Sequence, residues 1–392
     1  MNSIKDISFF NKKALIRVDF NVPFDGNKIS DNSRILAAIP TINYVLKNGG
    51  SCIVMSHLGR PKKRENKFSL IRVKQELEEL LDQVVIFVEN CIGPETKIAS
   101  ERLMPGEVLL LENLRFHKEE TAGDEKFAKE LSSLAEIYIN DAYGTTHRDH
   151  ASTSTIAKYF TEKSAGLLLE KEIMSLKKVL ESPRKPVTAI VGGAKVSSKI
   201  SIIANMLKVI DNLVVGGGMA YTFILSIGGK VGDSICEPEN LGDCREILDL
   251  AKKNNVKIFL PTDVVVSKSF SNNDKQKEVN IKKIPDGWQG LDIGTKTRQK
   301  FSDVIKQSST ILWNGPMGVF EMSSFQNGTK TVANAVADAT KKGSFSLVGG
   351  GDSVAAIKKF NLNDKISFIS TGGGAMLESL EGKILPGIKA LQ

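Results

Sequence analysis

Short apolar runs alternate with amphipathic segments along almost the whole chain, and this alternation restricts the possible folds more than any other feature of the sequence. In the first half the runs are ALIRVDF, SCIVMS, VVIFVE, EVLLLE and EIYIN, each followed by turn residues. Between the first two, residues 33–50 carry isoleucines at helical spacing, and Gly49 stands where a C-cap glycine belongs. Similar amphipathic stretches cover residues 70–81 and 125–135. The pattern predicts buried parallel strands separated by helices.

The second half repeats this alternation. It predicts helices that begin at Val196 and Met219, and strands over residues 187–191, 213–215, 256–260, 310–313, 345–348 and 366–369. Repeated strand and helix order of this kind is typical of sheets covered by helices on both faces. We therefore expect an α/β protein made of two doubly wound, Rossmann-like parallel-sheet domains.

A long amphipathic helix over residues 167–180 separates the two halves. It ends before SPRKP, whose prolines cannot continue a helix. The 392 residues also exceed the roughly 250–300 at which a single core usually stops growing. We expect an N-terminal domain over 1–166, a connecting helix or hinge over 167–183 and a C-terminal domain over 184–375. Residues 376–392 are expected to return to the first domain.

Glycine is concentrated just after the strands of the second half. The clusters are GGAK (192–195), GGGM (216–219), GPMG (315–318), GGGD (349–352) and TGGGA (371–375). In an open α/β sheet the carboxyl ends of the strands line the ligand crevice, and glycine lets a phosphate approach the N–H groups at helix starts. These clusters predict a phosphate-binding crevice in the C-terminal domain.

Cationic and polar side chains follow the strands of the first half instead. They are Arg17, Asp19, Asn21, Arg34, His57, Arg60, Arg115 and Arg148. The planar guanidinium suits carboxylate and phosphate oxygens, and each charge-assisted bond contributes about 1.5–3 kcal/mol. For any single arginine, a solvent-exposed surface position is as good an explanation as ligand binding. Five arginines at strand ends favour a small ligand with several negative charges.

Two lysines and one aspartate accompany the glycine turns. Lys195 and Lys199 in GGAKVSSK lie four residues apart near a predicted helix start, so both ammonium groups would share one face. They either neutralise a phosphoryl group or are exposed helix lysines. Asp352 after GGG is either a Mg²⁺ ligand or a helix N-cap. Spacing does not separate these alternatives.

Several other classes lose support. The formal charge of +8 comes from dispersed Lys and Arg without a basic tail, which argues against nucleic acid. The four cysteines are far apart, which disfavours a disulfide framework or a zinc site. No apolar run reaches the eighteen residues of a membrane helix, and charges in the opening stretch disfavour a signal peptide. A cytoplasmic protein is expected. Neither GxGxxG nor GxxxxGK[ST] occurs, which disfavours a dinucleotide-linked dehydrogenase and a P-loop NTPase.

Ten sequence blocks, in order, resemble those of the phosphoglycerate kinase family over nearly the whole chain. They are RVDFNVP, SHLGRP, LLLENLRFHKEE, NDAYGTTHRDHAST, GGAKVSSKI, GGGMAYTF, GWQGLDIGTKT, ILWNGPMGVFE, GGGDSVAA and STGGGA. The resemblance implies a monomeric enzyme that moves a phosphoryl group reversibly between 1,3-bisphosphoglycerate and MgADP, giving 3-phosphoglycerate and MgATP. Thr295, Ser198 and the Arg148-Asp149 pair depart from the usual family forms.

The resemblance also assigns the two substrates to the two halves. It implies that 3-phosphoglycerate or its bisphosphate is bound by Asp19, Asn21, Arg34, His57, Arg60, Arg115 and Arg148. It implies that the nucleotide is bound by Gly192, Lys195, Lys199, Gly216, Gly217, Gly290, Asn314, Glu321, Gly350, Gly351, Asp352 and Ser353. Mg²⁺ is the expected cofactor, with Asp352 as its ligand.

Phosphoryl transfer needs in-line positioning and charge neutralisation more than covalent help. We therefore expect Arg34, Lys195 and Lys199 to act on the transferring group, assisted by glycine N–H groups of 349–351 and 371–374. Closure about the connecting helix is expected to bring the substrates together. The alternatives are a non-catalytic anion-binding or nucleic-acid-binding protein on the same fold, and an NAD-linked dehydrogenase.

Overall fold

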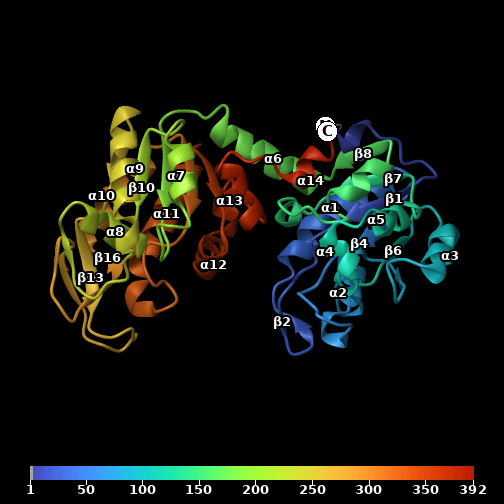
Figure 1. The fold of residues 1–392 in the computed structure, drawn as a ribbon, viewed down its shortest axis with the longest axis horizontal. Helices are drawn as coiled ribbons and strands as arrows, with labels where there is room; N and C mark the ends of the chain where they lie inside the picture. The colour runs from blue at the N-terminus through green and yellow to red at the C-terminus, as the bar shows by residue number, and fades with distance from the viewer. Residues whose placement is uncertain (1–2) are drawn as a thin grey trace. The chain divides into compact units, whose positions relative to one another are not determined.

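The computed structural model describes residues 3–392 and divides into two compact units. The first contains the chain up to residue 174 together with 384–392, and the second contains residues 175–383 (Figure 1). No helix within residues 3–392 has the length and apolar character needed to cross a bilayer.

The first unit is an α/β structure. Its strands are β1 (Lys13–Arg17), β2 (Phe24–Asp25), β3 (Lys28–Ile29), β4 (Ser51–Met55), β5 (Val85–Phe87), β6 (Val108–Leu110), β7 (Ile137–Asn140) and β8 (Glu162–Ala165). Its helices are α1 (Ser33–Lys47), α2 (Ile71–Leu81), α3 (Pro94–Arg102), α4 (Lys118–Ala122), α5 (Glu125–Ser132) and, near the end of the chain, α14 (Pro386–Lys389). Helix α6 (Leu167–Leu180) begins in this unit and ends in the second.

Six of these strands form one parallel sheet in the order β5-β6-β4-β1-β7-β8. The chain leaves β1 toward β4 and leaves β7 toward β8, so the connections diverge between β1 and β7. Ligands of doubly wound sheets bind outside the carboxyl ends of the strands at such a switch point. Residues that follow Arg17 and Asn140 therefore lie at the expected binding position.

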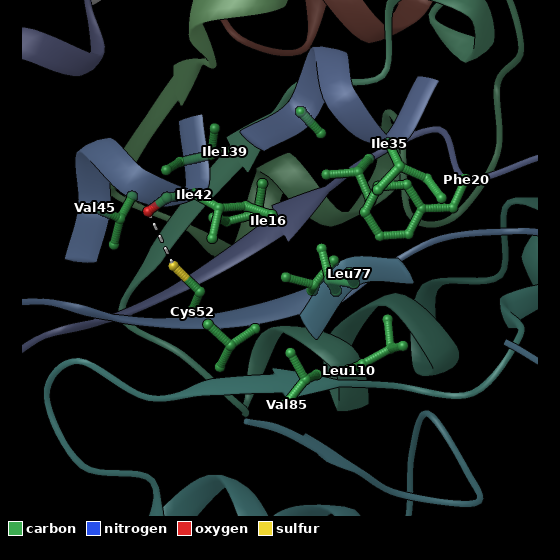
Figure 2. Packing of buried hydrophobic residues seen from close by; sticks show 14 of the residues in the cluster. Ile16, Phe20, Ile35, Ile42, Val45, Cys52, Leu77, Val85, Leu110 and Ile139 are labelled. Atoms are coloured by element: carbon green, nitrogen blue, oxygen red, sulfur yellow. Dashed lines mark hydrogen bonds between the residues drawn. The ribbon is translucent and has the colours of Figure 1, made fainter. Parts of the chain in front are cut away.

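Apolar strand residues form the core of this unit. Every residue of β4 and β7 is buried, because helices cover both faces of a parallel sheet. Figure 2 shows Ile16 and Cys52 packed beside α1, with the thiol of Cys52 donating to the carbonyl of Ile42 at 3.7 Å. Burial raises the pKa of the Cys52 thiol, which makes this cysteine an inert part of the core.

The second unit is also α/β. Its strands are β9 (Val187–Val191), β10 (Asn212–Val215), β11 (Lys230–Val231), β12 (Lys257–Phe259), β13 (Asp263–Ser267), β14 (Lys277–Asn280), β15 (Lys283–Ile284), β16 (Gln289–Ile293), β17 (Thr310–Asn314), β18 (Phe345–Val348) and β19 (Phe368–Ile369). Its helices are α7 (Ile200–Met206), α8 (Met219–Ser226), α9 (Leu241–Lys253), α10 (Thr295–Lys306), α11 (Asn327–Lys341), α12 (Gly351–Lys359) and α13 (Gly374–Leu380).

The main sheet of this unit is parallel, in the order β12-β10-β9-β17-β18-β19. Its connections diverge between β9 and β17, whose last residues Val191 and Asn314 are register partners. The turns that follow these two strands begin with Gly192 and Gly315. The two-sheet α/β architecture predicted from the alternation is confirmed, and each sheet has its own switch point.

A three-stranded antiparallel sheet of β13, β14 and β16 was not predicted. Strand β13 is buried along its whole length, so its sequence DVVVS lacks the alternation that marks a strand exposed on one face. Strand β14 is mostly exposed, and its sequence KEVN carries little apolar signal. Sequence periodicity therefore missed this sheet.

Two sequence expectations need correction. The helix predicted to begin at Val196 begins at Ile200, so Lys195 precedes it in an irregular turn and Lys199 is its N-cap. The segment that belongs to the first unit is 384–392 rather than 376–392. Helix α13 stays in the second unit, where the side-chain amide of Asn205 in α7 donates to the carbonyl of Leu380 at 2.8 Å.

The start of α6 rests on a buried carboxylate. Asp141 Oδ1 accepts from the backbone N–H groups of Leu168 at 2.9 Å and Leu169 at 3.1 Å. Asp141 Oδ2 is buried and finds no hydrogen-bond partner among residues 3–392. Burial is the main reason that the pKa of Asp141 rises to about 7. The carboxylate thus holds the first turn of α6 at an electrostatic cost.

Replacing Asp141 by asparagine is expected to change how stability depends on pH. An unfolded aspartate loses its proton near the ordinary aspartate pKa of 3.8, whereas folded Asp141 keeps its proton to about 7. The folded state therefore binds the extra proton between these values, and stability falls as the pH rises through this window. In urea unfolding from pH 4 to 8, the unfolding free energy of the wild type should fall by about 4 kcal/mol relative to that of Asp141→Asn, which has no carboxyl group to titrate. Parallel curves for the two proteins would contradict this.

Candidate active site

Asp19, Asn21 and Arg34 form one side of a polar cluster beyond β1. The Arg34 guanidinium lies 3.1 Å from Asp19 Oδ2 and donates to the Asn21 carbonyl at 3.0 Å. Asn21 Oδ1 accepts from the backbone N–H of Gly59 at 2.8 Å. The loop after β1, the start of α1 and the loop after β4 are thereby joined at the carboxyl end of the sheet.

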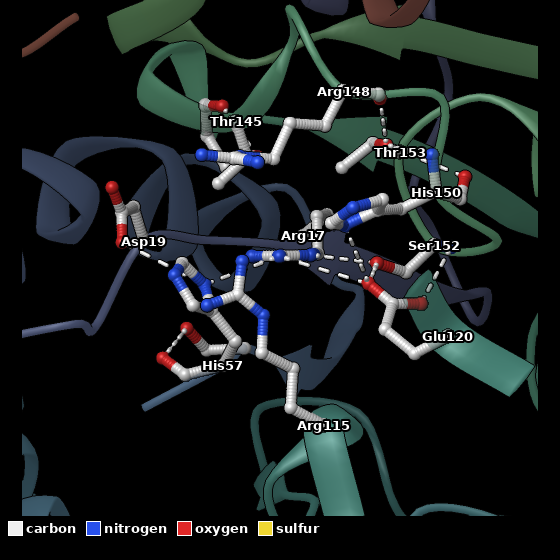
Figure 3. Close-up of polar contacts among 12 residues, drawn as sticks. Arg17, Asp19, His57, Arg115, Glu120, Thr145, Arg148, His150, Ser152 and Thr153 are labelled. Atoms are coloured by element: carbon white, nitrogen blue, oxygen red, sulfur yellow. Dashed lines mark hydrogen bonds and ion pairs between the residues drawn. The ribbon is translucent and has the colours of Figure 1, made fainter. Parts of the chain in front are cut away.

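His57 and Arg115 lie on the other side of this cluster (Figure 3). Arg115 donates to the Gly59 carbonyl at 2.7 Å, which brings it to the same loop that Asn21 holds. Burial first, and then the charges of Arg17, Arg115 and Arg34, lower the pKa of His57, so its ring is neutral at physiological pH. Burial and the neighbouring arginines lower the pKa of Arg115 to about 10, so it keeps its charge.

Arg60 and Arg148 complete the cluster at a cavity of about 710 Å³. Arg115 and His150 also line it, together with Lys62, Lys63, Lys118 and other residues of the 60–63 and 115–121 segments. Burial, followed by the charges of Arg115, Arg17 and Arg148, lowers the pKa of His150 to about 4. The structure therefore brings all seven residues that the family resemblance assigns to phosphoglycerate to one end of the sheet, where positive charge is in excess.

Arg17 was predicted to converge on the ligand with the other arginines, but its guanidinium lies beneath the cluster and does not line the cavity. It is the last residue of β1 and is fully buried. Its guanidinium donates to Ser152 Oγ at 2.8 Å and to the Val18 carbonyl, and lies 3.3 Å from His57 Nδ1. Arg17 still belongs to the strand, and its guanidinium is enclosed by Ser152, Val18 and His57. Asp19 and Asn21 follow the end of the strand and are partly exposed, so they reach the crevice.

In the second unit three glycine turns pack against one another. The Gly193 N–H donates to the Pro316 carbonyl at 3.0 Å, and the Gly217 N–H donates to the Met317 carbonyl at 3.1 Å. A Cβ at Gly192 would lie 2.1 Å from the Pro316 oxygen. Only glycine allows this backbone approach, so the turns after β9, β10 and β17 form one glycine-lined surface.

Lys199 is held at this surface by Asn314. Its ammonium group donates to Asn314 Oδ1 and to the Asn314 carbonyl, the latter at 3.4 Å. The side-chain amide of Asn314 donates in turn to the Gly349 carbonyl at 2.8 Å. Burial lowers the pKa of Lys199 to about 8, an effect that nearby Asp352 partly opposes. The lysine remains a cation at neutral pH and lies close to the turn that precedes α12.

Asp352 and Ser353 occupy the first turn of α12. The N-cap of this helix is Gly350, so the alternative that Asp352 is the N-cap is wrong. Asp352 is exposed, whereas Ser353 is buried and accepts from the Gly315 N–H at 2.6 Å. No group of three or more metal-ligating side chains occurs within 3–392. A single exposed carboxylate beside a glycine turn suits Mg²⁺, which takes one or two carboxylates together with phosphate oxygens and water.

Comparison with known proteins identifies the family. A family model described as phosphoglycerate kinase matches residues 4–383. The chain is 50% identical over 390 residues to a phosphoglycerate kinase of Moorella thermoacetica, covering 99% of this chain and 98% of that protein. It is 48% identical over 391 residues to one of Herpetosiphon aurantiacus, with the same coverage. The chain belongs to the phosphoglycerate kinase family.

Two solved phosphoglycerate kinase structures have the same fold. The one from Coxiella burnetii superposes with a TM-score of 0.91 at 40% identity, covering 100% of this chain and 98% of that one. The one from Pyrococcus horikoshii gives 0.86 at 33% identity, with the same coverage. Family membership makes the protein a kinase and supports this reading over a non-catalytic anion-binding protein.

The remaining predicted nucleotide residues of this phosphoglycerate kinase family member lie beside the glycine turns. Gly216 follows β10, and Gly290 lies in β16, where a Cβ would collide with the Tyr221 hydroxyl. Glu321 is exposed at the end of the loop after β17. In the same loop, the Val319 N–H donates to the Leu291 carbonyl of β16 at 2.9 Å. Gly350, at φ +90°, and Gly351 begin α12. Packing against Tyr221 alone accounts for the glycine at position 290.

Sequence reasoning missed the buried partners of the arginine cluster. Glu120 and Ser152 lie beneath it and are fully buried. Neither residue directly follows a strand. Glu120 stands beside another glutamate in KEE, a pattern that is typical of an exposed helix position. Only the tertiary contacts reveal that these two residues support the site.

Proposed function

We propose that a carboxyl oxygen of 3-phosphoglycerate accepts the phosphoryl group from MgATP. In the reverse direction, the acyl phosphate of 1,3-bisphosphoglycerate donates the group to MgADP. The observation that carries this proposal is the excess positive charge around His57 and Arg115, opposed within the described chain chiefly by Asp19 and Glu120. A small molecule with carboxylate and phosphate groups satisfies such a cluster. Arg60, Arg148, Asn21 and Asp19 would complete its binding.

In this proposal Arg34, Lys195 and Lys199 neutralise charge on the transferring group. The attacking atom is an ADP oxygen in one direction and a carboxylate oxygen in the other, and neither carries a proton that a base must remove. Catalysis then rests on alignment and electrostatic stabilisation. Glycine N–H groups of 349–351 and 371–374 would assist.

The nucleotide is proposed to bind along the glycine turns of the second unit. Gly192, Gly216, Gly217, Gly350 and Gly351 would present backbone groups to its phosphates. Asn314, Ser353, Gly290 and Glu321 would contact its remaining parts. Asp352 would hold Mg²⁺, which neutralises phosphate charge when it is bound.

Transfer requires that two substrates held on separate units meet with water excluded. We therefore propose that the connecting segment around α6 supports domain closure, and that one chain suffices as a cytoplasmic monomer. Scattering that shows no compaction when both substrates are added would contradict closure.

The decisive experiment supplies ATP, Mg²⁺ and 3-phosphoglycerate together with hydroxylamine. An acyl phosphate formed on the carboxyl group reacts with hydroxylamine to give a coloured hydroxamate with ferric iron. A yield that depends on all three components supports the proposal. ADP formation without hydroxamate would place the phosphoryl group on another acceptor and overturn it.

Replacing Arg115 by alanine is expected to weaken binding of 3-phosphoglycerate specifically. Arg115 Nε is buried and has no hydrogen-bond partner in the described part of the chain, so it can donate a hydrogen bond to a bound anion. Loss of a charge-assisted bond of about 1.5–3 kcal/mol should raise the KM for 3-phosphoglycerate by roughly 10- to 100-fold. The KM for MgATP should stay within about twofold, as a steady-state assay would measure.

The matched control is Arg102→Ala, which removes the same charge from an exposed position in α3. It should leave both KM values unchanged. Equal increases in the KM for 3-phosphoglycerate in the two variants would attribute the effect to net charge rather than to the Arg115 contact.

A further inference from the structure

Glu120 lies beneath the arginine cluster and is fully buried in α4. Its Oε1 accepts from Ser152 Oγ at 2.6 Å, and its Oε2 accepts from the Ser152 N–H at 3.0 Å. Arg17 Nη2 lies 4.0 Å from Oε1, which is an ion-pair distance without a direct hydrogen bond. Figure 3 shows Ser152 between Glu120 and Arg17. Glu120 therefore reaches the cluster through Ser152.

The hydrogen bonds that link Arg17, Ser152 and Glu120 can have only one donor and acceptor order. Arginine has donors and no acceptor, so the 2.8 Å contact runs from Arg17 Nε to Ser152 Oγ. The serine hydroxyl has one proton, and its 2.6 Å contact with a carboxylate places that proton on the Glu120 side. Glu120 thus orients the hydroxyl so that its lone pair faces Arg17.

The same rule fixes the tautomer of His57. Arg17 Nη2 lies 3.3 Å from His57 Nδ1, and because Arg17 can only donate, Nδ1 must be the acceptor. Asp19 Oδ1 lies 3.9 Å from the same nitrogen, too far for a competing hydrogen bond. In a neutral ring the proton then resides on Nε2. His57 can therefore donate from Nε2 to an anionic oxygen.

We propose that Glu120 is a positioning residue that, through Ser152 and Arg17, holds His57 in the Nε2-protonated tautomer as a hydrogen-bond donor to the anionic substrate. This inference rests on the proposed function for the nature of that substrate. The tautomer itself is a property of the free protein, so it can be tested without any turnover.

The test is Ser152→Ala, examined by nitrogen NMR of labelled histidine in the free protein and by steady-state kinetics. Without the hydroxyl, Arg17 Nε loses its acceptor while Nη1 keeps the Val18 carbonyl, so the guanidinium can turn toward Glu120 Oε1 and away from His57. The wild type should show the Nε2-protonated signature at His57, and Ser152→Ala should show a mixture of tautomers. The KM for 3-phosphoglycerate should rise about tenfold, with the KM for MgATP unchanged. The chain has 4 histidines, which keeps the spectrum simple.

Ser164→Ala is the matched control. Ser164 is equally buried, lies in β8, and its hydroxyl has no partner among the residues that the structure describes. This variant should leave the His57 signals and both KM values unchanged. Glu120→Gln should reproduce the Ser152→Ala spectrum if it folds. An unchanged Nε2-protonated signature in Ser152→Ala would overturn the proposal, as would a wild type that is not in this tautomer. Absence of hydroxamate formation would instead remove the proposed function alone.

Discussion

Replacing Lys199 by methionine is expected to lower kcat by two to three orders of magnitude. The ammonium group is held at the glycine turns by Asn314, whose amide also contacts the Gly349 carbonyl. A cation fixed in this way needs no reorganisation when charge moves onto the transferring phosphoryl group, and loss of one such preorganised group typically costs about 10²–10³ in kcat. The KM for 3-phosphoglycerate should change little, because that substrate is proposed to bind on the first unit. Steady-state kinetics with both substrates varied would measure these values.

Lys208→Met is the control for the loss of charge. Lys208 lies just after α7, is exposed and donates to Asn205 Oδ1 at 3.1 Å. It should keep wild-type kcat. If Lys199→Met retains kcat within about threefold, or if only KM changes, Lys199 has no role in the transfer step.

The lowered pKa of Lys199 gives the wild type a pH signature that the variant should lack. The ammonium form is the functional one, so kcat/KM for the nucleotide should fall as the pH rises through about 8. Bound phosphate stabilises the charged form, and kcat itself should therefore hold to higher pH. A fall in kcat/KM that persists in Lys199→Met would assign the ionisation to another group.

The sequence predicted the two parallel sheets because each buried strand is a short apolar run, and α6 because its amphipathic pattern ends at prolines. It failed between residues 260 and 293, where β13 is buried along its length and β14 is mostly exposed. The start of α7 was placed four residues early because Val196 is buried and fits the apolar pattern. Periodicity reports burial, and burial does not distinguish a turn from a helix.

Candidate site residues were predictable to the extent that they follow strands. Asp19, His57 and Arg115 were found in this way, because the carboxyl ends of parallel strands meet at one edge of the sheet. Arg17 was misjudged, because it is the last residue of β1 itself and its guanidinium is bound inside the protein by Ser152 and the Val18 carbonyl. Lys195 and Lys199 looked equivalent in sequence, but Lys195 is exposed and Lys199 is held by Asn314. Such differences depend on contacts that are distant in sequence.

Replacing Gly217 by alanine is expected to disrupt the nucleotide side of the site. Gly217 has a φ of +68°, which costs an L-residue about 1–2 kcal/mol. An added Cβ would also lie 2.6 Å from the Gly193 nitrogen, 2.7 Å from the Gly193 oxygen and 2.8 Å from the Pro316 oxygen. These are backbone atoms, so no rotamer change relieves the overlap, and about 1–3 kcal/mol of packing strain adds to the conformational cost. The three glycine turns must move apart.

The expected result is a loss of about 2–5 kcal/mol in the unfolding free energy of the second unit, with ADP affinity reduced at least tenfold. Urea unfolding and titration calorimetry would measure the two quantities. Gly242→Ala is the matched control, because Gly242 lies inside α9 and an added Cβ would meet nothing within 4 Å in the described chain. Gly242 is the second residue of α9 and alanine is the better helix former, so this variant should lose no stability and bind ADP normally. Separation of the turns would displace the backbone N–H groups that are proposed to bind the nucleotide. Normal ADP affinity in Gly217→Ala would therefore mean that the nucleotide does not bind at the packed glycine turns.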